Sequence, residues 1–510
     1  MPIIGVMNLD SSVCYAALLA RDSRHDGQFF TCVKTTGIYC RPVCPARPPL
    51  FKNCSFVLSA AAAQDAGFRP CLRCRPESSP GMGAWCGTST SVQRALSLIE
   101  MGSLDEGDVT ALAERLGMGD RHLRRLFQQH LGATPVAVAQ TRRLLLAQQL
   151  IHETSLSMTD VALASGFGSV RRFNETFQAL HSKPPSALRR LQAKPGAIHP
   201  GADIELLLSY RPPYDWPSML GFLRARAIPG VELVDEHQYQ RVIRLDGRVG
   251  RIAVSHVPER GALKVRVSFP KLAALPVIIA RVRRVFDLNA EPQAIATALS
   301  ADARLAPLVQ ARPGLRLPGA WDGFEIAVRA ILGQQITVAG ATRLAAKLVD
   351  LLGCPLAVDT GHPALSHAFP SPDQFTEEAL SSLGMPQARR SSLVSLARAV
   401  SLQPHLFERH ASLEQAVEQL RVLPGIGEWT AQYIAMRALS ESDAFLAADV
   451  ALQRIMANGE GQRPTARALL QRAEPWRPWR AYAVMHLWAS DASAASATSP
   501  SSRTHHATVD

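Results

Sequence analysis

The stretch "VLPGIGEWTAQYIAMRAL", residues 422–439, joins a turn rich in proline and glycine to a helical pattern. Pro424, Gly425 and Gly427 predict a tight turn between two helices, because glycine leaves room for a close approach. Backbone N–H groups at the start of the second helix can then bind a phosphate. Taken alone, the pattern with Ile426 inside it also fits an ordinary turn between helices. Its function therefore depends on the rest of the chain.

The rest of the carboxyl-terminal half supplies that context. Asp449, within "AFLAADVALQR", follows the turn closely. From about residue 204 to 490 the chain resembles AlkA, the alkylation-repair glycosylase of the helix-hairpin-helix type, notably in "YRPPYDWPSMLGFLRARAIPGVE" and "EPWRPWRAYAVMHLW". The resemblance implies that the turn binds DNA, that Asp449 is catalytic, and that Trp429, Tyr433 and Trp488 line the base pocket. Related strand-cleaving enzymes have a lysine at the position of Trp429, so we expect a monofunctional enzyme.

The implied reaction is hydrolytic release of an alkylated base such as 3-methyladenine. A purine alkylated on a ring nitrogen is cationic, so it can leave without a general acid. Asp449 would stabilise the sugar cation or orient water, after the base has been extruded from the stack. A cationic base over the aromatic faces gains roughly 0.5–2 kcal/mol.

Two positions depart from the AlkA pattern. Ala448 stands where the family often has a second acidic residue, which leaves Asp449 as the carboxylate of that motif. Gln335 stands where the residue that wedges into the DNA duplex is apolar. Glutamine can still fill the gap, and this second departure bears on the efficiency of base extrusion and on the range of substrates.

Four of the nine cysteines form two close pairs near the amino terminus. Cys40 and Cys44 lie in "TTGIYCRPVCPARP", and Cys71 and Cys74 lie in "FRPCLRCRPE". Two thiol pairs at these spacings suit one tetrahedral Zn²⁺ ion, because each short turn brings both members of a pair to the metal. The spacing alone favours a structural zinc that stabilises a small domain.

The same motifs resemble the amino-terminal domain of Ada, the bacterial adaptive-response protein, over roughly residues 10–78. In that family the first cysteine of the cluster accepts a methyl group from a methylphosphotriester in DNA, and the matching position is Cys40. Zinc keeps a thiol deprotonated, which makes the sulfur nucleophilic toward a methyl carbon. We expect the transfer to be stoichiometric, because a thioether has no easy route back.

Two helical pairs lie between these regions, at residues 108–135 and 158–185, each with a glycine-containing turn. A single pair is weak evidence, but the two together resemble the AraC family of transcription regulators, whose second helices enter the major groove. The expected DNA contacts are basic or polar residues of those second helices: Arg121, His122, Arg124, Arg125, Arg171, Arg172 and Asn174. A solvated helix face explains any one of these arginines equally well.

Composition limits the partners and the compartment. The chain has 510 residues, 47% of them hydrophobic, and a formal net charge of +12, with the front 200 residues the more basic part. Such charge favours nucleic acid as a partner, although a solvated basic face gives the same balance. Neither a membrane span nor a secretory leader is visible, so we expect a bacterial, cytoplasmic and nucleoid-associated protein.

Stretches rich in Pro, Gly and Ser at residues 75–91 and 194–203 predict linkers. The expected fold is multidomain and mainly α with α+β parts. Its expected domains are a zinc methyl-acceptor domain (1–80), an AraC-type double helix-turn-helix domain (85–192), a small α+β domain (204–275), a helix-hairpin-helix glycosylase domain (276–490) and a disordered tail (491–510).

These parts together predict DNA alkylation repair and its regulation, with Zn²⁺ as cofactor and with damaged DNA, operator DNA and RNA polymerase as partners. One alternative is a methylation-responsive regulator whose glycosylase-like part is a non-catalytic DNA-binding scaffold. Another keeps the enzyme and reduces the front half to a DNA-targeting device. The "PCHR"-type motif of alkylguanine methyltransferases is absent from the sequence, so repair of O-alkylated guanine is not expected.

Overall fold

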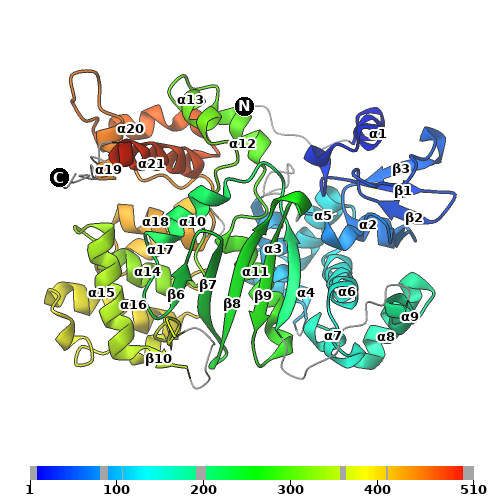
Figure 1. The fold of residues 1–510 in the computed structure, drawn as a ribbon, viewed down its shortest axis with the longest axis horizontal. Coiled ribbons are helices and arrows are strands. Elements are labelled where there is room, and N and C mark those ends of the chain that lie inside the picture. The colour runs from blue at the N-terminus through cyan, green and yellow to red at the C-terminus, as the bar shows by residue number, and fades with distance from the viewer. Residues whose placement is uncertain are drawn as a thin grey trace, which may run out of the picture.

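The structure, a computed structural model, describes residues 9–80, 90–105, 107–190, 203–356, 363–408 and 412–497. Most of the two expected linkers and the end of the expected tail lie outside these residues. The described chain forms a cysteine-rich part (9–80), a helix-turn-helix part (90–190), a sheet part (203–288) and a hairpin part (289–497), as Figure 1 shows. The expected fold class, mainly α with α+β parts, is confirmed. None of the described helices combines the length and apolar character needed to cross a membrane.

The cysteine-rich part is a small sheet flanked by two helices. Its elements are α1 (Ser11–Ala20), β1 (Phe30–Val33), β2 (Ile38–Cys40), β3 (Cys54–Val57), α2 (Ala60–Asp65) and β4 (Arg69–Pro70). The strand order is β3-β1-β2-β4, and β4 runs parallel to β2 while the other pairs are antiparallel. Few side chains fill the space between sheet and helix, with Phe30 and Tyr39 the largest. A core this small contributes little stability.

Seven helices form the helix-turn-helix part of the described chain. They are α3 (Thr90–Glu100), α4 (Val109–Arg115), α5 (Asp120–Leu131), α6 (Pro135–Glu153), α7 (Met158–Ala164), α8 (Val170–His181) and α9 (Pro185–Arg190). In the turns before α5 and α8, Gly117 and Gly166 have φ of +69° and +89°, a left-handed conformation that glycine adopts without strain. The side chains of Asp108 and Ser169 cap α4 and α8. The two expected helix pairs, α4–α5 and α7–α8, are therefore present.

The sheet part is a five-stranded antiparallel sheet in the order β5-β9-β8-β7-β6, with two helices. Its elements are β5 (Ile204–Ser209), α10 (Trp216–Arg224), β6 (Glu232–Val234), β7 (Gln238–Leu245), β8 (Arg248–Val257), β9 (Ala262–Ser268) and α11 (Leu275–Val285). The core of this part continues beyond residue 275, because Ile278 and Val282 of α11 belong to it. The same cluster includes Leu150 of α6 and Phe173 of α8, so the helix-turn-helix part and the sheet part share apolar contacts.

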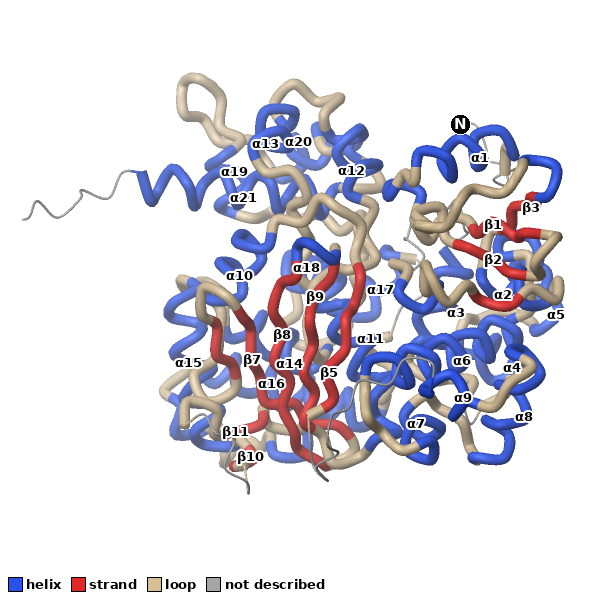
Figure 2. The backbone as a smooth tube through the Cα atoms, turned by 45° about the vertical axis from the view of Figure 1, so that its right-hand side comes forward, coloured by secondary structure: helices blue, strands red, loops and turns tan. Residues whose placement is uncertain are grey.

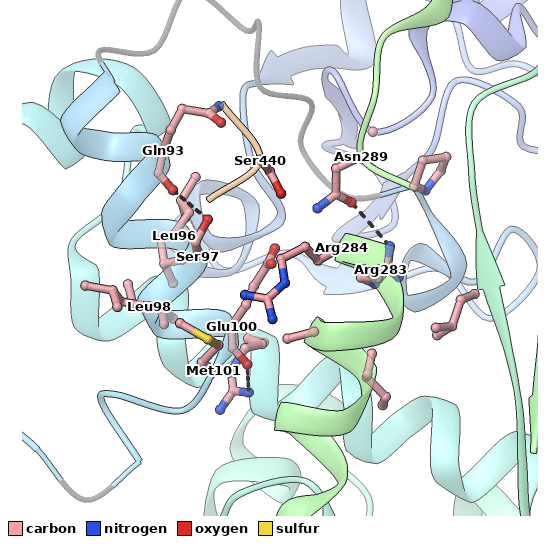
Figure 3. A pocket seen from close by; sticks show the side chains of 18 of the residues that line it. Gln93, Leu96, Ser97, Leu98, Glu100, Met101, Arg283, Arg284, Asn289 and Ser440 are labelled. Atoms are coloured by element: carbon pink, nitrogen blue, oxygen red, sulfur yellow. Dashed lines mark hydrogen bonds between the residues drawn. The ribbon is translucent and has the colours of Figure 1, made fainter. Parts of the chain in front are cut away.

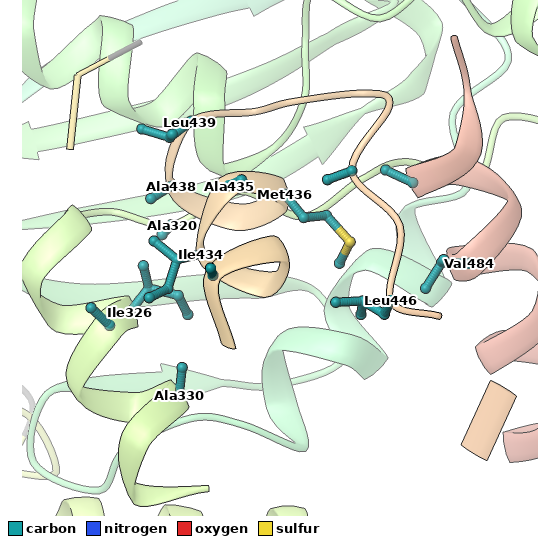
Figure 4. Close-up of a cluster of buried hydrophobic side chains, with 14 of the residues drawn as sticks. Ala320, Ile326, Ala330, Ile434, Ala435, Met436, Ala438, Leu439, Leu446 and Val484 are labelled. Atoms are coloured by element: carbon teal, nitrogen blue, oxygen red, sulfur yellow. The ribbon is translucent and has the colours of Figure 1, made fainter. Parts of the chain in front are cut away.

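Helices form most of the hairpin part. They are α12 (Pro292–Leu299), α13 (Leu305–Ala311), α14 (Gly323–Leu332), α15 (Val338–Leu352), α16 (Gln387–Leu402), α17 (Leu413–Arg421), α18 (Glu428–Ala438), α19 (Val450–Ile455), α20 (Ala466–Arg472) and α21 (Arg480–Ala497). Two short strands, β10 (Cys354–Pro355) and β11 (His367–Ala368), pair beside β7. Figure 4 shows small and branched side chains of α14 and α18 packed together, among them Ala330, Ile434 and Ala435. Small residues let these helices approach closely, which positions α18 for the site described below.

The carboxyl-terminal tail differs from the expectation. Disorder was expected from residue 491, but α21 continues to Ala497. Alanine has the highest helix propensity, and Asp491 accepts a hydrogen bond from Arg454 Nη2 at 2.6 Å, so this segment can extend the helix. Residues 498–510 lie outside the described residues.

The parts also meet through specific hydrogen bonds. Strand β5 lies at a sheet edge, and the backbone N–H of Leu207 donates to Glu153 Oε2 at 3.1 Å while its carbonyl accepts from Gln149 Nε2 at 2.8 Å. Glu153 also forms an ion pair of 2.8 Å with Arg75, next to Cys74. Helix α6 thereby satisfies an open sheet edge and connects three parts at one point.

A cavity of about 390 Å³ lies where α3, α11 and the segment after α18 come together. Figure 3 shows Leu96 and Glu100 on one side, Arg283 and Arg284 on another, and Ser440 between them. Its walls come from all four parts, because Phe30 and Ser59 of the cysteine-rich part also line it.

Candidate functional sites

Asp449 lies at the amino-terminal end of α19, where its carboxylate is held by three donors. Oδ1 accepts from the backbone N–H of Leu452 at 2.9 Å and from Trp488 Nε1 at 3.2 Å. Oδ2 accepts from Trp429 Nε1 at 2.9 Å. The resemblance to AlkA predicted that Asp449, Trp429 and Trp488 share one site, and in the structure both indoles donate to the Asp449 carboxylate.

The aromatic wall of the same site is a stacked pair. The rings of Trp429 and Tyr433 lie 5.2 Å apart between centroids and are inclined by only 6°. The two residues are one helical turn apart on α18, so their side chains share one face. Arg437, a turn further on, donates from Nη1 to the Tyr433 hydroxyl at 2.8 Å.

Asp449 and this aromatic wall line a cavity of about 1130 Å³. The cavity extends from the carboxylate, between α14 and α18, toward the sheet part, where Glu232 of β6 and Arg241 of β7 line its inner end. Sequence reasoning identified the mouth of this cavity and missed its inner end. Arg226, in "GFLRARAI", lies among the lining residues, and as a single arginine it gave no signal in the sequence.

The turn before α18 has the geometry that the sequence predicted. Gly425 has φ of +80°, and a Cβ there would lie 2.1 Å from the hydroxyl oxygen of Ser392, so only glycine fits. Pro424, Gly425 and Gly427 are exposed, whereas Ile426 is buried and anchors the turn. The N-cap residue of α18, Gly427, has no side chain to cap the helix, so among the described residues its first N–H groups are open to a phosphate.

Gln334 supports this turn and was missed by sequence reasoning. Its Nε2 donates to the carbonyl of Gly425 at 2.8 Å and to Thr430 Oγ1 at 3.1 Å. Gln335, the next residue, is exposed and has φ of +61°, and Ile336 beside it is also 42% exposed. The segment between α14 and α15 therefore presents both a polar and an apolar side chain at the mouth of the cavity.

The four paired cysteines come together in the cysteine-rich part. The sulfurs of Cys40, Cys44, Cys71 and Cys74 all lie within 4.8 Å of one another. A tetrahedral zinc ion with bonds of about 2.3 Å needs sulfurs roughly 3.8 Å apart, so this cluster fits the metal. Cys40 is the most accessible of the four, since the other three are at most 7% exposed.

Arg41 contacts the cysteine cluster through both its backbone and its side chain. Its backbone N–H donates to Cys74 Sγ at 3.3 Å, and its guanidinium bonds the carbonyl of Cys74 at 3.1 Å and the Ser78 hydroxyl at 2.7 Å. It also forms a buried ion pair with Asp26. N–H donors and a nearby cation stabilise thiolates over thiols, as a zinc site requires.

The second helix of each helix-turn-helix pair presents its predicted contacts to solvent. Those exposed residues are Arg121, His122, Arg124 and Arg125 on α5, and Arg171, Arg172 and Asn174 on α8. Two of them form ion pairs within their own helix, Arg124 with Asp120 and Arg171 with Glu175, both at 2.8 Å. Such exposed pairs contribute little and can exchange for phosphate.

Three family models match the chain, each in a different region. They are the metal binding domain of Ada at residues 13–77, a helix-turn-helix domain at 112–191 and the AlkA N-terminal domain at 205–322. With the cysteine cluster, the first match identifies the metal site as a zinc site. The class of protein is thus a zinc- and DNA-binding protein of DNA alkylation repair and its regulation.

Relatives narrow this class to a family. A probable bifunctional transcriptional activator/DNA repair enzyme AlkA of Mycobacterium tuberculosis is 40% identical over 95% of this chain and 97% of its own length. The chain belongs to the family of these bifunctional AlkA proteins. DNA-3-methyladenine glycosylase 2 of Escherichia coli is 37% identical over 56% of this chain and 96% of its own length. The resemblances expected from the sequence, to Ada, to AlkA and to a helix-turn-helix regulator, are confirmed.

Two further comparisons concern single parts. The bifunctional transcriptional activator/DNA repair enzyme Ada of Escherichia coli is 39% identical over 30% of this chain and 42% of its own length. The solved 3-methyladenine DNA-glycosylase of Archaeoglobus fulgidus has a TM-score of 0.50 and 23% identity, covering 56% of this chain and 98% of its own. That structure supports the glycosylase fold of the carboxyl-terminal half.

Proposed function

We propose that the carboxyl-terminal half is a monofunctional glycosylase that hydrolyses the bond between an alkylated base and deoxyribose. The observation that carries this proposal is the Asp449 carboxylate, fixed by two indole N–H donors at the mouth of a cavity large enough for a base. A fixed carboxylate beside the sugar stabilises the positive charge that develops at C1′. The stacked Trp429 and Tyr433 hold the extruded base.

In the proposed reaction the C1′–N bond breaks and its electron pair leaves with the base. A water oxygen adds to C1′ and releases a proton. A Schiff-base route would need an amine at the position of Trp429, whose side chain here only donates to Asp449. Incubating the purified chain with methylated duplex DNA tests the proposal: free bases and intact strands are expected, whereas the scaffold alternative predicts binding without base release.

We further propose that Cys40 accepts a methyl group from a methylphosphotriester. Its sulfur attacks the methyl carbon, the S–C bond forms, the C–O bond breaks, and the phosphodiester leaves as an anion. Cys40 is the thiol of the cluster that a bulky DNA phosphate can reach, because the other three are buried. The product is a thioether, so the transfer is proposed to be stoichiometric.

The helix-turn-helix part is proposed to read an operator and to recruit RNA polymerase, in the cytoplasm and near the nucleoid. The cysteine-rich part packs directly against its first unit, since Ser59 donates to the carbonyl of Leu131 at the end of α5 at 2.7 Å. Gln64 accepts from the hydroxyl of Thr141 on α6 at 3.0 Å. The part that carries the zinc cluster and the first helix-turn-helix unit are therefore in direct contact.

Methylation of Cys40 is expected to tighten operator binding. The four-thiolate zinc site changes from about −2 to about −1, and the lost repulsion from DNA corresponds to on the order of 1–2 kcal/mol, or roughly tenfold in Kd. The gain should shrink as salt rises. Titrating operator DNA with methylated and unmethylated protein at two salt concentrations measures it. Equal affinities at low salt would eliminate the switch and leave the methyl transfer untouched.

Exchanging Gln335 for leucine is expected to improve action on duplex DNA. A side chain that fills the gap left by the base is transferred out of water. For an amide this desolvation costs roughly 1–3 kcal/mol more than for an alkyl group. Leucine, like glutamine, is unbranched at Cβ, so the left-handed backbone is not strained further. Release from duplex should rise about threefold or more, with single-stranded substrate as the control. A fall on duplex alone would reject a wedge role for Gln335.

A further inference from the structure

The inner end of the base cavity carries a group of buried charges from four elements. Arg241 of β7 and Arg329 of α14 each bond a carboxylate oxygen of Glu325 at 2.6 Å. Arg329 also pairs with Glu232, whose other oxygen accepts from the Tyr239 hydroxyl at 2.6 Å. All four carboxylate oxygens of Glu232 and Glu325 are thus occupied by protein donors.

Two further arginines at the same end have no carboxylate partner among the described residues. Arg437 is bound to the Tyr433 hydroxyl and to the carbonyls of Pro318 and Gly319. Arg226 donates to the carbonyl of Phe222 at 3.3 Å, and its guanidinium lies 3.8 Å above the Phe222 ring. A guanidinium has five N–H donors, so Arg226 keeps donors for the cavity it lines.

The electrostatics at Tyr433 agree with this geometry. Burial alone would raise the pKa of the Tyr433 phenol, but Arg437, Arg226 and Arg329 outweigh burial and the pKa is lowered. The inner end therefore has a surplus of positive charge and of hydrogen-bond donors, and each carboxylate oxygen of Glu232 and Glu325 already accepts from a protein donor. It is suited to an electronegative atom of the base and poorly suited to an amino group.

We propose that Arg226 is a specificity-determining residue that selects bases with a carbonyl oxygen on the edge facing the cavity floor. Guanine presents the acceptor O6 where adenine presents an amino donor, and arginine pairs with O6 in DNA recognition. An alkylated 6-oxopurine inserted between the Trp429–Tyr433 wall and Asp449 would place its oxygen toward Arg226. An alkylated adenine would place its amino group, a donor, against the N–H donors of Arg226. This inference rests on the proposed glycosylase function and names the substrate class of that same site.

Internal competition in one substrate tests the proposal. Duplex DNA treated with a methylating agent contains both 7-methylguanine and 3-methyladenine, which are both cationic, so their comparison isolates the oxo–amino difference. Release of each base is measured by chromatography for wild type and for Arg226→Met. We expect the ratio of 7-methylguanine to 3-methyladenine released to fall at least tenfold in Arg226→Met, with 3-methyladenine release unchanged or faster.

Arg454→Met is the matched control. Arg454 lines the mouth of the same cavity and pairs with the exposed Asp491, so its loss removes an equal charge without touching the inner end. Its release ratio should equal that of wild type. An unchanged ratio in Arg226→Met, or an equal loss of both bases, would overturn the assignment. If wild type released neither base, the glycosylase function itself would fail. Continued release of 3-methyladenine by Arg226→Met shows that the variant is folded.

Discussion

Asp449→Asn is expected to lower base release at least about 100-fold, equivalent to roughly 3 kcal/mol of transition-state stabilisation. The substitution removes one negative charge next to C1′, where positive charge develops as the base leaves. DNA binding in the ground state should stay near wild type or become tighter, because a carboxylate close to phosphates is lost. Single-turnover release from methylated DNA and a binding titration on unmodified duplex measure the two effects.

The fold should tolerate this change. Asparagine caps a helix as well as aspartate does, so the bond to the backbone N–H of Leu452 can be kept. One indole, that of Trp429 or Trp488, would lose its acceptor, which costs about 1 kcal/mol. Asp215→Asn is the matched control, since Asp215 caps α10 in the same way and does not line the cavity. Wild-type release rates in Asp449→Asn would reject the proposed role.

The chemistry that was predictable from sequence depends on residues close together in the chain. Cys40 and Cys44 share one short segment, so their spacing alone shows that both can reach one metal. Pro424, Gly425 and Gly427 likewise define a turn by backbone preference. The aromatic residues carried no comparable signal, because tryptophan and tyrosine at helical spacing usually pack in a core. Only the resemblance to AlkA assigned them to a pocket.

Features built from distant residues left no local pattern. The bond between Gln149 and Leu207 joins two expected domains across a predicted linker, and nothing in either segment indicates its partner. Arg226 was unremarkable as a single arginine on a partly exposed segment after α10. Its role depends on Glu232 and Glu325 already being bonded by Arg241, Arg329 and Tyr239, which is a property of the assembled cavity. The acceptor balance of a buried site is therefore visible only in three dimensions.

Removing a zinc ligand is expected to have the largest effect on folding. Wild type should contain one zinc per chain, and Cys74→Ala should bind none under the same conditions and lose the folded cysteine-rich part. Structural zinc contributes about 10–16 kcal/mol in small metal-dependent domains, far more than the few buried side chains between this sheet and α2 can replace. Metal analysis and limited proteolysis of residues 9–80 measure the loss. A folded wild type without zinc would contradict the assignment.

The same variant tests how far the parts depend on one another. The core of the hairpin part contains no residue of the cysteine-rich part, so base release by Cys74→Ala should stay within about threefold of wild type. One series of contacts could couple the two parts. Arg75, which follows Cys74, pairs with Glu153, and Glu153 accepts a hydrogen bond from the edge strand β5. The side chains of this pair are only 23% and 11% exposed, so its loss should weaken the sheet edge, but it leaves intact the apolar core that α6 and the sheet part share. Cys54→Ala, which removes a thiol of the same part outside the cluster, should keep both zinc and base release. A loss of base release beyond tenfold in Cys74→Ala alone would mean that the junction through Glu153 transmits the unfolding, and that the repair enzyme depends on its sensor for stability.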